Sequence, residues 1–177
     1  MTMQVGEGFA GTAPNLAHVN TVLGDRHGSV GTAFTTALAQ PSTGHVPFLA
    51  VVRPGVAVQP PTLFVNKAAV ASELHGTLTW GAAQAGVAEG VVDALADGIV
   101  DAAQVGELVL VCAVWVDPAA DDEDAVRQNN RAATRAALAA GRTGSPHVDE
   151  VVALRGQAKN PYLSAAAVED SQQHQKD

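Results

Sequence analysis

The chain has 177 residues and a mass of 18.0 kDa, which suits a single domain, and its sequence contains no inter-domain linker. Its formal net charge of −8 argues against a nucleic-acid-binding domain and against binding to an anionic membrane, because both need a basic surface. One cysteine, Cys112, excludes a disulfide framework within the chain, and neither a secretory signal nor a ~20-residue apolar span is present, so we expect a cytoplasmic protein.

The first part of the chain predicts two strands followed by a helix. Residues 3–10 and 17–23 are short, partly alternating segments with turn residues between them, a pattern typical of neighbouring strands. In residues 30–38 the apolar side chains recur at helical offsets, which predicts an amphipathic helix. Pro41 follows this segment and predicts its end.

The middle of the chain predicts two further strands and a second helix. Residues 46–52 form an apolar run, interpreted as a buried strand. Residues 62–70 predict another strand, entered from the rigid Pro60-Pro61 pair. Valine and leucine at helical spacing within residues 81–96 predict the helix, which Gly98 would end.

The last part predicts the central strand and a long helix. Leu108–Val116 is almost uniformly apolar, as expected of a strand buried on both faces. Residues 121–140 are acidic first and basic later, a charge order that favours a helix through its dipole. Residues beyond Tyr162 are polar, and we expect a flexible tail. Strands come first and helices mix with them later, which indicates an α+β sandwich.

Three generic motifs are better explained without a ligand. Residues 6–11 match G-x-G-x-x-G, but too little chain precedes them for the strand that a dinucleotide site needs, so we interpret the match as chance or as turn chemistry. None of the six histidines pairs at the i, i+4 spacing of a helical zinc site, and no metal site is expected. The acidic run Asp121–Asp124 lacks the spacing of a calcium loop and suits a helix N-terminus.

Two polar side chains interrupt apolar strands. His18 lies in the middle of the second strand, and strand alternation places Asn20 on the same face. Lys67 lies near the end of another apolar segment. Polar groups inside apolar strands need partners, so each side chain is either a structural group with a hydrogen-bond partner or part of a functional site.

Several segments, taken together and in chain order, resemble the formaldehyde-activating enzyme family. The family shows an A-H-I-D strand, an L-L-A-V strand, a P-x-T-L-M-x-N-K segment and an F-G-P-A-Q turn. The corresponding segments here are Ala17–Gly24, Leu49–Val51, Pro61–Lys67 and Trp80–Gln84. Further matches are Asp117-Pro118, the helix with Asn130 and Ala132–Thr134, and Ala158–Tyr162. The resemblance covers roughly residues 3–163, with similar spacing throughout.

The resemblance implies an activity, a fold and an assembly. Members of the family condense formaldehyde with tetrahydromethanopterin, a reduced pterin, to give the methylene derivative and water, and they need no metal or prosthetic group. The implied fold is a two-layer α+β sandwich like the second domain of ribosomal protein S5. The implied assembly is a homopentamer with active sites between subunits. On this basis residues 1–163 form one family domain and residues 164–177 the polar tail.

The resemblance also assigns roles residue by residue. The family's histidine, its general acid, falls on His18, and its pterin-contacting leucine falls on Leu49. Its lysine and glutamine fall on Lys67 and Gln84. Three positions depart from the pattern, and they are Asn20 for an aspartate, Ala69 for a threonine and Ala82 for the turn proline.

The departures leave alternatives to the family activity open. Asn20 loses the charge of an aspartate and gains two donors, which changes the hydrogen-bond pattern offered to a pterin. Ala69 loses a hydroxyl. The chain is therefore a formaldehyde-condensing enzyme with His18 as acid, a relative acting on another amine carrier, or a non-catalytic protein that binds an aldehyde or a pterin.

Overall fold

The computed structural model describes residues 3–159. Its strands are β1 (Gln4–Ala10), β2 (Ala17–Asp25), β3 (Phe48–Leu49), β4 (Val51–Arg53), β5 (Val56–Ala57), β6 (Thr62–Asn66) and β7 (Leu108–Trp115). Its helices are α1 (Ser29–Ala39), α2 (Glu73–Thr77), α3 (Gln84–Ala96), α4 (Glu123–Thr143) and α5 (Val148–Ala153), with a π-helical segment η1 (Leu78–Ala83) and a 3-10 segment η2 (Ala102–Glu107). The chain divides into two compact units at Ser145, and α5 belongs to the second. The polar tail expected at residues 164–177 lies outside the described residues.

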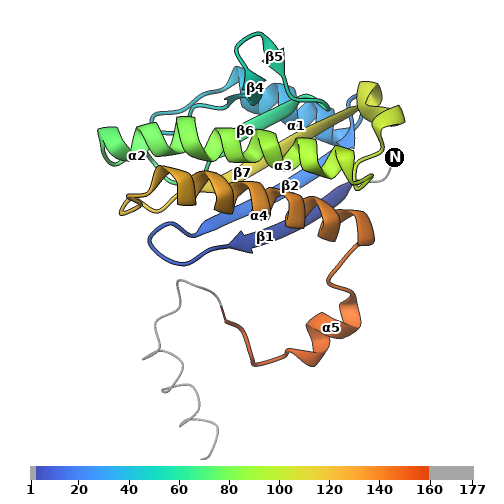
Figure 1. Ribbon diagram of the computed structural model, residues 1–177. Helices are drawn as coiled ribbons and strands as arrows, with labels where there is room; N and C mark the ends of the chain where they lie inside the picture. The colour runs from blue at the N-terminus through green and yellow to red at the C-terminus, as the bar shows by residue number, and fades with distance from the viewer. Residues whose placement is uncertain (1–2, 160–177) are drawn as a thin grey trace, which may run out of the picture. The chain divides into compact units, whose positions relative to one another are not determined.

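Five strands form one mixed sheet in the order β1-β2-β7-β6-β3 (Figure 1). The β6 and β7 pair is parallel and the other pairs are antiparallel. Strand β7 lies at the centre, as its continuous apolar sequence predicts. A mixed α+β architecture is therefore confirmed.

One face of the sheet carries the long helices α3 and α4 (Figure 1). Inward side chains of β2 and β7 alternate along each strand and are fully buried, among them Val19, Leu110 and Val114. The two helices run parallel and are joined by a series of ion pairs. From one pair to the next, both partners lie four residues further along their helices. The pairs are Arg127–Glu89 at 2.9 Å, Arg131–Asp93 at 2.6 Å and Arg135–Asp97 at 2.7 Å.

The G-x-G-x-x-G string has a packing role. Gly6 and Gly8 lie in β1 and face α4, so closely that a Cβ on either would overlap the backbone carbonyl of Ala137 or Ala133. The glycines thus let the helix lie against the strand. This confirms that the string is not a nucleotide loop, although it lies in a strand and not in the expected turn.

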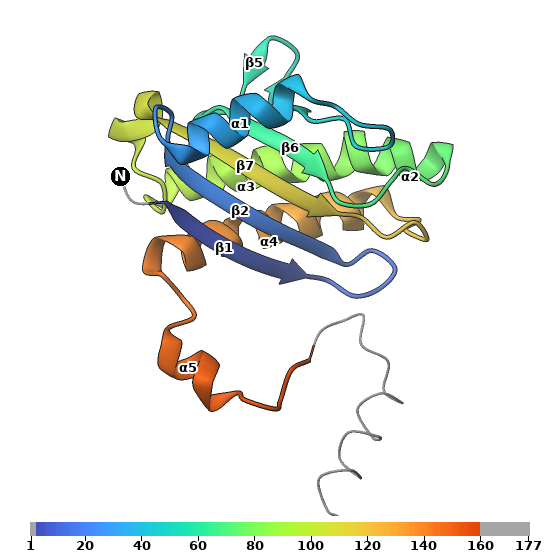
Figure 2. The same ribbon diagram turned by 180° about the vertical axis from the view of Figure 1, so that it is seen from behind.

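Only part of the opposite face is covered, and the cover is α1 (Figure 2). Val30 and Phe34 of this helix pack with Leu63 of β6 and Val109 of β7 in a second, smaller apolar cluster. The helix thus adds a partial third layer to the expected sandwich. Among the helices of the first compact unit, none lies above the beginning of β2 and the end of β7.

The apolar run at residues 46–52 is not one buried strand, so this prediction was wrong. It divides at Ala50, whose N–H donates to the Thr62 carbonyl and whose own carbonyl accepts from the Val58 N–H. The chain therefore leaves the main sheet after β3 and enters the separate β4–β5 hairpin. Leu49, 41% exposed, and Val52, 53% exposed, lie on the surface.

The boundaries of one helix and one strand differ from the predictions. The helix predicted at residues 81–96 begins as α3 at Gln84, and the chain before it forms α2 and η1, which begin after the N-cap Ser72 and were not expected. The strand predicted at residues 62–70 ends at Asn66. The acidic run at the start of α4 does cap a helix, because Asp122 Oδ1 accepts from the Ala125 N–H at 2.9 Å.

Candidate active site

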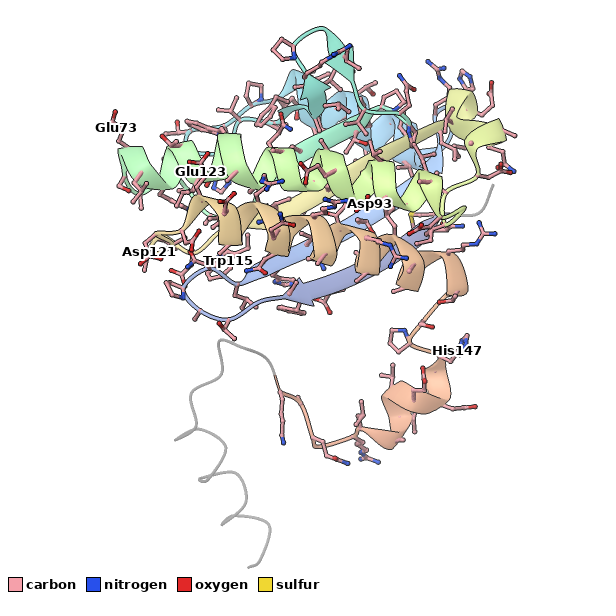
Figure 3. All side chains as sticks on the ribbon, in the orientation of Figure 1. Glu73, Asp93, Trp115, Asp121, Glu123 and His147 are labelled. Carbon is pink, nitrogen blue, oxygen red and sulfur yellow. The ribbon has the colours of Figure 1, made fainter. Side chains whose placement is uncertain are left out.

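A polar cluster occupies the uncovered end of the sheet's second face. The register sets Glu7 opposite Asn20 and Phe9 opposite His18, and sets His18 opposite Trp115 of β7. Directly paired residues share a face, so these side chains come together although β1, β2 and β7 are far apart in sequence. Trp115 is labelled at this end of the sheet in Figure 3.

Hydrogen bonds join three of these side chains and Lys67 in a row. Glu7 Oε1 accepts from His18 Nε2 at 2.7 Å and from Asn20 Nδ2 at 3.3 Å. Lys67 Nζ donates to Asn20 Oδ1 at 2.7 Å. The amide of Asn20 has one orientation, because a flipped amide would set its NH₂ against the ammonium and its oxygen against the carboxylate. The row His18–Glu7–Asn20–Lys67 is hereafter the polar row.

Lys67 reaches the polar row from the residue that follows β6. Its backbone N–H donates to the Val114 carbonyl at 2.7 Å, which prolongs the parallel ladder by one residue. The preceding Asn66 is buried, and its Nδ2 donates to the carbonyls of Gly44 and Ala68, both at 2.7 Å. This fixes the backbone on both sides of Lys67, and alternation then turns its side chain to the face that carries His18.

Some neighbours of His18 raise its pKa and others lower it. The side chain is 15% exposed, and its ring stacks on Phe9 with centroids 4.0 Å apart. Burial lowers the pKa of His18 below its ordinary value, and the charge of Lys67 adds to this, while the hydrogen bond and the charge of Glu7 raise it. Burial likewise lowers the pKa of Lys67, against the charge of Glu7. For His18, burial is the largest of these effects, so the imidazolium is disfavoured overall and Glu7 offsets this only in part.

Three of the residues assigned by resemblance lie elsewhere in the chain. Gln84 begins α3 on the other side of the sheet, is 8% exposed, and its Nε2 donates to the Val51 carbonyl at 3.0 Å. Ala69 is exposed in the segment after β6. Leu49 lies on β3, at the opposite edge of the sheet from β1.

The separation of Leu49 from the polar row follows from the register. Leu49 pairs with Leu63, which lies level with Val111 and Val22. Leu49 is therefore three strands away from His18 and four residues further along. At about 4.8 Å per strand and about 3.3 Å per residue, the two lie roughly 20 Å apart. His18, Asn20 and Lys67 form one group, and Leu49 and Gln84 belong to a second region within this chain.

Sequence reasoning missed Glu7 and Phe9. Both lie in β1 inside the G-x-G-x-x-G string, where they alternate with the glycines. Pairing β1 with β2 as an antiparallel hairpin would have brought Phe9 onto the His18 face, and Glu7 is the sole charged residue in β1.

The contacts of His75 were also not predicted, and this residue is buried beside the end of β7. Its Nδ1 accepts from the Ala71 N–H at 3.1 Å and its Nε2 donates to the Val116 carbonyl at 3.0 Å. Both ring nitrogens are occupied within the protein, and His75 therefore has a structural role.

Within residues 3–159, no three or more His, Cys, Asp or Glu side chains gather in a group that could hold a metal ion. Cys112 is buried in β7, and burial raises the pKa of its thiol, which removes it from nucleophilic chemistry. No helix among the described residues is long and apolar enough to cross a membrane. The polar row is thus the best candidate for chemistry in this part of the chain.

Comparison with known proteins identifies the family. The sequence model of the formaldehyde-activating enzyme (Fae) matches residues 5–163. The chain belongs to the formaldehyde-activating enzyme family. This confirms the resemblance seen in the sequence, and the match includes β1 to β7 and α4.

Two kinds of named relative match the chain. The chain is 39% identical over 158 residues to the 5,6,7,8-tetrahydromethanopterin hydro-lyase of Methanosarcina barkeri, covering 89% of each chain. It is 36% identical over 159 residues to the bifunctional enzyme Fae/Hps of Methanothrix thermoacetophila, and 37% identical over 161 residues to that of Methanococcoides burtonii. These two alignments include 90% and 91% of this chain, but only 41% of the length of each bifunctional relative.

Proposed function

We propose that the protein is a carbon–oxygen lyase that condenses formaldehyde with tetrahydromethanopterin, or a similar reduced pterin, to the methylene derivative and water. The observation that carries the proposal is the polar row, which puts a half-buried histidine against a carboxylate on an uncovered sheet face. Membership of the family and the name of the Methanosarcina barkeri relative support the reaction and its carrier.

His18 supplies the acid in this proposal. Formaldehyde first adds to a pterin amine and gives a carbinolamine, whose hydroxide is a poor leaving group. The His18 imidazolium transfers a proton to that oxygen, the C–O bond breaks, water leaves, and the nitrogen lone pair forms an iminium. The second amine attacks the same carbon and loses its own proton, which restores the acid. Such catalysis is worth ~10²–10⁴-fold when the pKa of the acid lies near the working pH.

The carrier-binding residues of the proposal are Asn20, Leu49, Lys67, Ala69 and Gln84. Lys67 lies beside His18 through Asn20 and can hold a carbonyl or anionic group of the carrier. Leu49 and Gln84 lie in the second region, so they would complete the site only when a neighbouring copy supplies them. This division supports an assembly of several subunits, which we propose to be the family's homopentamer with active sites between subunits.

Three further parts of the proposal concern the whole chain. The mixed sheet with its parallel β6–β7 pair supports a ribosomal protein S5 domain 2-like topology. The span of the family match supports one family domain at residues 1–163, although the described chain divides into two compact units at Ser145. No metal or prosthetic group enters the proposed reaction, because every step is an addition, a proton transfer or the acid-assisted loss of water. A free, buried Cys112 fits a reducing, cytoplasmic location.

A second carrier is the alternative that a specific observation favours. Asn20 stands where the family has an aspartate and Ala69 where it has a threonine, so the hydrogen bonds offered to the carrier differ. A site built around one hydrogen-bond pattern discriminates strongly against another. Tetrahydrofolate or another amine would then be the carrier.

The deciding experiment is the rate of formaldehyde condensation with and without the purified protein, after subtraction of the spontaneous reaction. Parallel assays use tetrahydromethanopterin and tetrahydrofolate. Saturable acceleration with tetrahydromethanopterin supports the first proposal, and acceleration with tetrahydrofolate alone supports the second. Binding of either pterin without acceleration by folded protein would overturn both in favour of a binding role.

A further inference from the structure

We propose that Glu7 is the positioning residue of His18, with a carboxylate that orients the imidazole and stabilises the imidazolium; this inference rests on the acid role proposed above. Glu7 lies on β1, whereas His18 lies on β2, and the two meet only because the hairpin pairs these strands. The role follows from contacts, charge and exposure of the described residues.

The geometry gives Glu7 control over the orientation of the ring. An ionised carboxylate only accepts hydrogen bonds, so the 2.7 Å contact requires a hydrogen on His18 Nε2. The stacked Phe9 ring, 15° from coplanar, holds the plane of the imidazole, and Glu7 holds its rotation within that plane. A general acid needs both, because proton transfer depends on a short and aligned contact with the substrate oxygen.

The charge balance gives Glu7 control over the protonation of the ring. The charged groups that act on His18 are Glu7 from β1 and Lys67 from the segment after β6. Lys67 and burial disfavour the imidazolium, so Glu7 is the negative charge that opposes them. The Glu7 side chain is 57% exposed, which leaves it in contact with water while its Oε1 reaches the ring.

Asn20 suits this role of Glu7. Its Nδ2 donates to the same Oε1 that holds His18, and its Oδ1 accepts from Lys67. A side chain at position 20 that donates to a carboxylate and accepts from an ammonium stabilises both neighbours at once. The departure from the family's aspartate therefore keeps Glu7 in place beside the acid.

The test measures the protonation of His18 directly in Glu7→Gln. Imidazole ¹H–¹⁵N correlations are followed against pH in the full-length protein, with the His18 signals assigned by their loss in His18→Ala. We expect the His18 titration to move to lower pH than in the unaltered protein. The same variant is assayed for condensation, where we expect roughly 10-fold less acceleration at neutral pH and recovery as the pH falls.

Two further variants separate charge from structure. Glu7→Asp keeps the charge with a shorter reach, and its titration should lie between those of Glu7→Gln and the unaltered protein. Glu107→Gln removes the same charge beside the far end of β7, and it should leave the His18 titration and the rate unchanged.

The outcomes keep this inference distinct from the proposed function. An unchanged or raised His18 titration in Glu7→Gln overturns the inference, and so does a lowered titration with an unchanged pH–rate profile. An unaltered protein that gives no acceleration overturns the proposed function instead, and the titration still decides whether Glu7 controls the imidazole.

Discussion

The second face of the sheet has two halves with opposite chemistry, although the same strands run through both. Under α1, Val22 and Val111 complete a dry apolar cluster. A few residues further along the same strand faces, His18 and Trp115 lie beside Glu7 and Lys67, and no helix of the first compact unit lies above them. One half stabilises the fold, and the other leaves polar groups accessible to a ligand.

The apolar pattern of β2 and β7 on this face stops where the covering helix α1 stops. An unsatisfied polar group under α1 would cost about 1–3 kcal/mol, whereas at the uncovered end the same group reaches partners and water. Substitutions in the two halves should therefore have separable effects. Those under α1 should change the free energy of unfolding, and those in the polar row should change the rate.

The largest effect is expected from His18→Ala in the uncovered half. Loss of the acid should remove a rate acceleration of ~10²–10⁴-fold, while the free energy of unfolding changes less than in a core substitution, because the His18 ring belongs to neither apolar cluster. Condensation rates and urea unfolding measure the two quantities. His27→Ala, in an exposed turn, is the matched control. Full activity in His18→Ala would refute the acid role.

The next effect is expected from Phe34→Ala in the covered half. Phe34 is 7% exposed and packs in the smaller apolar cluster. Its truncation should lower the free energy of unfolding by about 3 kcal/mol, with the condensation rate of the folded fraction kept. Urea unfolding reports the first and the rate per folded molecule the second. A large loss of rate in well-folded Phe34→Ala would mean that the two halves are coupled.

A smaller effect is expected from Lys67→Met. Removal of the ammonium takes away a charge that lowers the pKa of His18, so the imidazolium should persist to higher pH and the alkaline limb of the pH–rate profile should move upward. The KM for the carrier should rise about 10-fold, since one charged hydrogen-bond donor is lost. Arg53→Met, on the separate β4–β5 hairpin, is the control. A profile that moves downward would contradict the charge balance described for His18.

The smallest effect is expected from Asn20→Asp, which restores the family's residue. A new carboxylate favours the imidazolium of His18 but loses the hydrogen bond from position 20 to Glu7, so the net rise in activity with tetrahydromethanopterin should be only a few-fold if the carrier is the family's. Initial rates with tetrahydromethanopterin and tetrahydrofolate, compared with those of the unaltered protein, measure this. No change, or a loss, would indicate a site adapted to another carrier.

Local patterns in the sequence were enough to predict most elements of the fold. Alternation identified β1 and β2, helical spacing identified α1 and α4, and continuous apolarity identified β7. The prediction for residues 46–52 was wrong because the division of this run at Ala50 depends on two distant partners, Thr62 in β6 and Val58 directly after β5. No local pattern carries that information.

The candidate site was predictable only in part. His18 and Lys67 stood out as polar residues in apolar strands, strand alternation placed Asn20 on the face of His18, and the resemblance connected all three positions with a site. Glu7 escaped notice because its partner is fixed by cross-strand register, and its own surroundings in sequence are glycines. Polar constellations of this kind require the pairing of strands to be known first.

The glycines of β1 have one more consequence. Because α4 leaves no room for a side chain at Gly6 or Gly8, these two positions of the strand must lack a Cβ, and the residues that alternate with them are directed to the opposite surface. Glu7 and Phe9 are those residues. An alanine at Gly8 would push the strand away from α4 and so shift both contacts of His18, which makes the packing of this helix a determinant of the geometry of the polar row.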